Sequence, residues 1–116
     1  MDRHPGNYLR THRKRSGLSQ RDVAALLGYS DQDSVSRHEL VQSTPPLLIA
    51  LAYEAVFHVP VAKIFSGMYQ TVVQNVEERL ADFEQNLHNR SGSGPQAELL
   101  ARKLEWIAQR GGNPSV

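Results

Sequence analysis

The sequence predicts an all-α protein in which five short helices are followed by a helical hairpin. Apolar residues recur at helical spacing in several stretches, whereas the alternating apolar and polar pattern of strands does not occur. Glycine, proline, serine or asparagine stands where helices should begin and end. We expect a first domain over residues 1–67, a hairpin over residues 68–110 and a flexible tail over residues 111–116.

The composition excludes several classes of protein. The chain has 116 residues, 40% of them hydrophobic and 22% charged, which is typical of one small soluble domain. No apolar run approaches the ~18 residues of a membrane span, and the N-terminus does not resemble a secretory signal. With no cysteine, disulfides, thiolate zinc sites and a cysteine nucleophile are excluded, and a cytoplasmic location is consistent with the sequence.

The first two helices are predicted from their ends. Asn7 is suited to cap a helix that runs to about Ser16 and stops at Gly17. Ser19 then caps a second helix, in which Asp22 approximates a capping box, although aspartate is shorter than the usual glutamate. Gly28 ends this helix, and its buried side is expected to consist of Val23, Ala24, Leu26 and Leu27.

The third predicted helix, Gln32 to Glu39, is unusually polar. Only Val35 is clearly apolar, so this helix buries little of itself. We therefore expect it to be displayed on the surface, with Val35 as its anchor. Two short helices joined by a tight turn, the second polar and exposed, have the composition of a helix-turn-helix.

The next two helices start at prolines. Pro45 and Pro46 suit the first turn of a fourth helix, and Pro60 starts a brief fifth helix that Gly67 closes. The apolar stripe of the fourth helix is predicted to be Leu47, Leu48, Leu51, Ala52, Ala55 and Val56, and the fifth carries Val61, Ile64 and Phe65.

Beyond Gly67 the sequence carries a heptad seam, followed by a last helix over about residues 96–110. The Ser-Gly-rich stretch 91–95 predicts a break between the two helices. The seam either mediates self-association or packs inside a hairpin, and both apply if two chains form a four-helix bundle; Trp106 suits an interface or a core equally. The residues assigned to dimerisation are Tyr69, Val73, Val76, Leu80, Phe83, Leu87, Leu100, Leu104 and Ile107.

The charges are unevenly distributed. Residues 1–21 contain six basic side chains and one acidic side chain, whereas residues 68–90 contain four acidic and two basic ones. A basic N-terminal face suits a protein that approaches a polyanion from one side.

Several residues carry a resemblance to a known family. Gly17-Leu18-Ser19-Gln20, Leu27-Gly28 and Val35-Ser36-Arg37, together with Ala24 and Glu39, resemble the Cro/lambda-repressor (XRE) family of helix-turn-helix regulators. Leu51-Ala52 and Ile64-Phe65 are similar to the family's fourth and fifth helices, so the resemblance covers about residues 7–67. It implies a five-helix lambda-repressor-like domain.

The resemblance also implies roles for individual residues. Arg13 and Glu39 occupy positions that form a structural ion pair, and Asp31 or Ser30 would cap the third helix. Base edges would be contacted by Gln32, Asp33, Ser36 and Arg37. The DNA backbone would be contacted by Arg10, Lys14, Arg15, Ser19, Gln20, Ser30 and Ser34.

Two departures from the family pattern bear on these roles. The stretch between Gly28 and Val35 is one residue longer than in the shortest members, which can shift the register of residues 30–32 by one. Asp33 places a negative charge where DNA would lie; it either accepts a hydrogen bond from a cytosine amino group or weakens binding.

The expected function is sequence-specific binding of double-stranded DNA by a homodimeric regulator, by family analogy a repressor. The alternative is an antitoxin-type module whose segment after Gly67 binds a toxin while the helix-turn-helix binds its own promoter. No phosphate loop, metal-binding helix or nucleophile elbow occurs, and the five histidines lack metal-ligand spacing. We expect no enzymatic activity, no cofactor and no metal.

Overall fold

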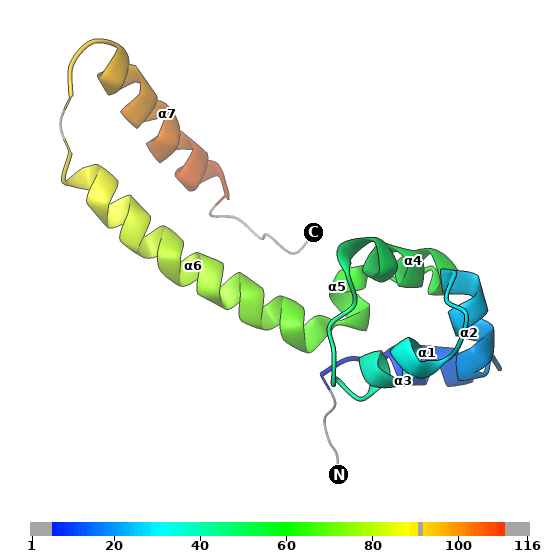
Figure 1. Ribbon diagram of the computed structural model, residues 1–116. Helices are drawn as coiled ribbons and strands as arrows, with labels where there is room; N and C mark the ends of the chain where they lie inside the picture. The colour runs from blue at the N-terminus through cyan, green and yellow to red at the C-terminus, as the bar shows by residue number, and fades with distance from the viewer. Residues whose placement is uncertain (1–5, 91, 111–116) are drawn as a thin grey trace. The chain divides into compact units, whose positions relative to one another are not determined.

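The computed structural model describes residues 6–90 and 92–110, and these residues form seven helices and no strand (Figure 1). The all-α fold class is therefore confirmed. The predicted tail at 111–116 lies outside the described residues, as do residues 1–5 and 91. The helices are α1 (Leu9–Arg15), α2 (Gln20–Leu27), α3 (Asp33–Glu39), α4 (Leu47–Phe57), α5 (Val61–Ile64), α6 (Ser66–His88) and α7 (Pro95–Arg110).

The chain divides into two compact units, one ending at Val72 and the other beginning at Val73. In the first unit, α2 packs against both α3 and α4, α1 packs against α3, and α4 packs against α5. The N-terminal segment closes onto α5, since the Tyr8 backbone N–H donates to the Ile64 carbonyl oxygen at 2.8 Å. The core of this unit consists of Leu9, Val23, Ala24, Val35, Tyr53, Ile64 and Phe65.

The ends of α1 and α2 have local causes that the sequence reveals. Gly17 (φ 76°) and Gly28 (φ 93°) both adopt the left-handed backbone that stops a helix. The capping box at the start of α2 is complete: the Ser19 side chain accepts from the Asp22 N–H at 3.0 Å, and the Asp22 carboxylate accepts from the Ser19 N–H at 2.9 Å. The shorter aspartate thus reaches far enough to serve in the box.

The rotation of α2 and α4 about their axes corrects part of the predicted core. Leu26 is exposed, and so are Leu47, Leu48 and Leu51. In α4 the fully buried side chain is Tyr53, so the opposite side of this helix, which is apolar apart from Glu54, faces solvent. An apolar stripe can be drawn on almost any side of such a helix, so the pattern alone did not identify the buried one.

Gly67 does not close the fifth helix as predicted. Helix α5 is a single turn that ends at Ile64, and α6 begins at Ser66, so Gly67 lies in the first turn of α6. Its φ is not positive, in contrast to Gly17 and Gly28, so the backbone continues as a helix.

The second unit consists of the rest of α6, a short connection and α7. The carboxylate of Glu77 and the guanidinium of Arg110 lie 3.0 Å apart, which joins the early part of this unit to the end of α7. Leu87 and Ile107 are its two buried apolar side chains among the described residues. Gly94 (φ 63°) precedes α7. The two helices therefore form an antiparallel hairpin with a small interior.

Candidate nucleic-acid interface

Helices α2 and α3 are held by a tight, hydrogen-bonded turn. After the left-handed Gly28, the Tyr29 N–H donates to the Ala24 carbonyl oxygen at 2.9 Å. The N-cap of α3 is Gln32, whose side chain makes no capping hydrogen bond, and the Asp31 carboxylate just before it accepts from the Asp33 N–H at 2.9 Å. These hydrogen bonds leave the connection between α2 and α3 little freedom.

Helix α3 separates its side chains into two groups. Val35 is fully buried in the core, and His38 and Glu39 are buried beside it. Gln32, which immediately precedes the helix, is exposed, as are Asp33 and Arg37, while Ser36 is half-buried. The helix thus presents a polar outer side that is free of contacts with the core, and this is the geometry that a major groove admits.

A buried polar cluster anchors the last turn of α3. His38 Nδ1 lies 2.8 Å from the Tyr53 hydroxyl of α4, and the Asn7 side-chain amide donates to the His38 carbonyl oxygen at 2.9 Å. Burial lowers the pKa of His38, with a smaller contribution from the Arg37 charge, and burial also raises the pKa of Tyr53. Both side chains therefore remain neutral near pH 7.

A second anchor is the ion pair between Arg13 and Glu39. The guanidinium donates twice to the Glu39 carboxylate, with Nε at 2.5 Å and Nη2 at 3.1 Å, and its Nη1 donates to the Leu18 carbonyl oxygen. The Gln20 amide donates to the same carboxylate at 3.1 Å. Glu39 thus links α1, α2 and α3, and its side chain is only 4% exposed.

The side chains expected to meet the DNA backbone are distributed around α3. Arg10, Lys14 and Arg15 are exposed on α1. Arg10 also lines a hollow of about 510 Å³ together with Thr11, Gln20 and Ser36. Ser19 and Ser30 are exposed and Ser34 is half-buried. Cationic side chains therefore lie on α1, which packs against α3, while the hydroxyls belong to α3 itself and to the residues that precede α2 and α3.

Comparison with known families agrees with this geometry: the sequence profile named Helix-turn-helix domain matches residues 6–52. This part of the chain is a helix-turn-helix domain. The match is consistent with the resemblance to the Cro/lambda-repressor regulators, and it indicates DNA binding and transcription regulation. Domains of this kind are typically not enzymes. Comparison with curated proteins and with solved structures finds no match to the chain.

Sequence reasoning missed one feature of the helix-turn-helix domain, the pairing of His38 with Tyr53. His38 is the most buried polar residue of α3. Its position three residues after Val35, on the same side of a short helix, was the available signal. The partner could not be read from the sequence because it depends on how α4 packs.

The residues predicted to mediate dimerisation have diverse environments. Leu87 and Ile107 are buried within the second unit, whereas Tyr69, Val76 and Phe83 are 39–42% exposed. The half-buried members are Val73, Leu80, Leu100 and Leu104. The hairpin interior therefore uses some of these side chains and leaves others at the surface.

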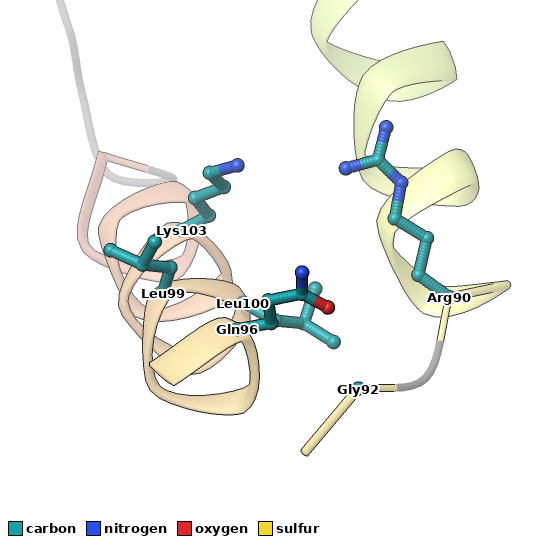
Figure 2. Close-up of a pocket in the computed structure, with 6 residues that line it drawn as sticks. All are labelled: Arg90, Gly92, Gln96, Leu99, Leu100 and Lys103. Atoms are coloured by element: carbon teal, nitrogen blue, oxygen red, sulfur yellow. The ribbon is translucent and has the colours of Figure 1, made fainter. Parts of the chain in front are cut away.

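The residues that the structure describes include no group of three histidine, aspartate or glutamate side chains that could hold a metal ion. No helix within 6–90 or 92–110 is both long and apolar enough to cross a bilayer. The second unit has a hollow of about 300 Å³, lined by Arg90, Gly92, Gln96, Leu99, Leu100 and Lys103 (Figure 2). Its two cationic side chains are exposed and lack a buried polar partner in the hollow, so this lining is not built for a specific small ligand.

Proposed function

We propose that the protein is a sequence-specific transcriptional regulator of double-stranded DNA that acts as a homodimer and represses by occupying a promoter. The observation that carries the proposal is α3 itself, a helix whose apolar side is buried and whose polar side is free. Regulation of this kind takes place where the genome lies, so we assign the protein to the cytoplasm.

Base recognition is assigned to the outer side of α3. Gln32, Asp33, Ser36 and Arg37 are in reach of base edges when α3 enters the major groove, and a guanidinium bonds bidentately to guanine. The position on the duplex is set by contacts to phosphates. We assign these contacts to Arg10, Lys14, Arg15, Ser19, Gln20, Ser30 and Ser34.

The homodimer is assigned to the hairpin segment, residues 68–110, with residues 1–67 as the DNA-binding domain. Two recognition helices contact half-sites about 10 bp apart, or a multiple of that, on one side of the duplex. Among the seam residues, Tyr69, Val76 and Phe83 remain exposed and are available to a second copy.

Selection of bound duplexes from a random DNA pool tests the proposal. We expect enrichment of one sequence with two symmetric half-sites, and an affinity that falls steeply with salt because binding releases counterions from the phosphates. If the bound duplexes recovered at low salt share no enriched sequence, sequence-specific binding is contradicted. Enrichment of a single, asymmetric half-site contradicts the dimer alone.

A further inference from the structure

One side of the hairpin carries exposed apolar side chains from both of its helices. Val76 and Phe83 of α6 are 39% and 40% exposed, and Leu99 and Trp106 of α7 are each 50% exposed. In each pair the residues are seven apart, so they lie on the same side of their helix, two turns apart.

Val76 and Phe83 follow the inward-facing Val73 and Leu80 by three positions, and Leu99 and Trp106 precede the inward-facing Leu100 and Ile107 by one. In two antiparallel right-handed helices both offsets turn a side chain toward the same side of the hairpin. On α7, Leu99 lines a hollow together with Lys103 and with Arg90, which follows α6 (Figure 2). We name the combined surface of Val76, Phe83, Leu99 and Trp106 the open face. These four residues all belong to the second compact unit.

The Glu77–Arg110 ion pair gives the register of the two helices. Because they are antiparallel and joined at 3.0 Å by this pair, a residue six positions after Glu77 is level with one six positions before Arg110. Phe83 is therefore level with Leu104, and Trp106 lies within about two residues of the same height, about 3 Å along the axis. The two aromatic residues are therefore at similar heights along the hairpin.

We propose that a second copy of the chain covers the open face, with α6 of each protomer lying antiparallel to α7 of the other. The twofold axis then runs along the helices, and Phe83 of one protomer packs on Trp106 of the partner subunit. Symmetry makes this aromatic contact twice. The inference rests on the homodimer of the proposed function and names its interface.

Charge distinguishes this arrangement from one in which like helices meet. Residues 73–90 carry four acidic and two basic side chains, a net charge of −2, whereas α7 carries two acidic and three basic ones, a net charge of +1. Pairing α6 with α7 brings opposite net charges together. Pairing α6 with α6 brings like charges together and costs free energy.

The open face is large enough for a reversible dimer. Two helices about 10 Å wide and about 24 Å long cover about 500 Å² per protomer, or about 1,000 Å² in the pair. This is at the lower limit of specific protein interfaces. We therefore expect a dimer that dissociates on dilution.

Cross-linking of single-cysteine variants tests the arrangement, and the absence of native cysteine makes the result unambiguous. We mix full-length Phe83→Cys with Trp106→Cys at a concentration at which sedimentation shows the wild type to be a dimer, and then oxidise the mixture. The proposal expects cross-linked dimers that contain one copy of each variant, and few from either variant alone. The exposed Leu48 on α4 provides the control, and Leu48→Cys mixed with Trp106→Cys should give none.

Other outcomes overturn the inference at different levels. Efficient self-cross-linking of Phe83→Cys means that α6 pairs with α6, which overturns this interface and leaves the proposed dimer intact. A dimer by sedimentation without any of these cross-links also overturns the interface alone. A wild type that sediments as a monomer at every concentration overturns both the interface and the dimer, while the DNA selection still tests sequence-specific binding.

The single tryptophan gives a second measurement that does not need cysteine variants. Trp106 emission should shift to shorter wavelength as the wild type dimerises, and Phe83→Ala should weaken dimerisation by about tenfold or more because it removes a central aromatic contact twice. Leu48→Ala should leave dimerisation unchanged. Circular dichroism of each variant establishes that it is folded. A folded Phe83→Ala protein that dimerises as the wild type does contradicts the proposed contact.

Discussion

Arg37 is the side chain of α3 best suited to distinguish one base pair from another. It is exposed, and within the described residues its side chain has one hydrogen-bond partner, the Ser34 hydroxyl at 3.5 Å, at the limit of a hydrogen bond. An exposed guanidinium with so weak a hydrogen bond can donate to both acceptors of a guanine.

We therefore predict that Arg37→Ala weakens binding to the selected operator by about 1–3 kcal/mol and relaxes the preference at one base pair. Lys14→Ala is the matched control, because loss of a phosphate contact weakens binding to all sequences about equally and lowers the salt slope by about one. Affinities for the operator and its single-base variants distinguish the two. An unchanged base preference in Arg37→Ala contradicts the assignment.

Glu39 serves the fold, since its buried carboxylate joins three helices. We predict that Glu39→Ala destabilises the first unit by about 3 kcal/mol or more, because Arg13, whose side chain is 12% exposed, loses its partner. Glu77→Ala breaks the more exposed pair with Arg110 and should cost less than about 1 kcal/mol. Denaturant unfolding measures both, and equal losses contradict the structural role of Glu39.

The buried His38 predicts a dependence of stability on pH. Burial and the Arg37 charge lower its pKa in the folded state, whereas the unfolded chain has the ordinary value of about 6.5. As the pH falls below about 6.5 the unfolded state binds more protons, so the stability of the fold decreases until the folded pKa is passed.

Unfolding free energies between pH 7.5 and 5 measure this effect. His38→Asn should flatten the dependence on pH. A folded His38→Asn protein that retains the wild-type slope shows that His38 is not its origin.

These residues differ in how far they could be predicted from the sequence. Val35 was identified as the anchor because it is the one apolar residue of a polar helix. The contact between His38 and Tyr53 joins residues 15 positions apart on different helices, and no local pattern encodes the packing that brings them together.

At the scale of the element, the start of α2 depends on a few backbone hydrogen bonds. We predict that Ser19→Ala costs about 1 kcal/mol, since it leaves the Asp22 N–H without its acceptor. Ser16→Ala is the control: Ser16 follows the end of α1, its hydroxyl donates to the His12 carbonyl oxygen in an exposed hydrogen bond, and the loss of this bond should cost no more than about 0.5 kcal/mol. Thermal unfolding checks the pair, and equal shifts would mean that the capping box does not stabilise α2.

Helix ends were predictable because their causes are local, as at Ser19 and Gly28. The side of each helix that is buried was less predictable, as the exposed Leu26 and Leu47 show, because the packing of neighbouring helices decides it. The prediction that Gly67 ends the fifth helix was wrong for a related reason. Glycine ends a helix where the backbone turns left-handed, and the backbone at Gly67 instead continues as α6.

At the scale of the whole molecule, the two units differ in how much they bury. Among the described residues, the first unit has a core of seven buried apolar side chains, whereas in the second unit only Leu87 and Ile107 are buried. A hairpin with so small an interior has little stability of its own.

We predict that amide hydrogen exchange is slow in α2 and α4 and fast in α7 at low protein concentration. Exchange in α7 should slow as the concentration rises, because a second copy then covers the open face. Mass spectrometry of exchanged peptides measures both. Concentration-independent exchange in α7 contradicts the proposed association, and α2 serves as the internal reference.

Helix α3 keeps its structural residues separate from its outward-facing residues, and this has a consequence for the evolution of the protein. Val35, His38 and Glu39 maintain the fold, while Gln32, Asp33 and Arg37 point outward and contribute little to it. Substitutions at the outer positions are thus nearly free of selection for folding. A duplicated gene could acquire a new target site through a few such changes, without passing through an unstable ancestor.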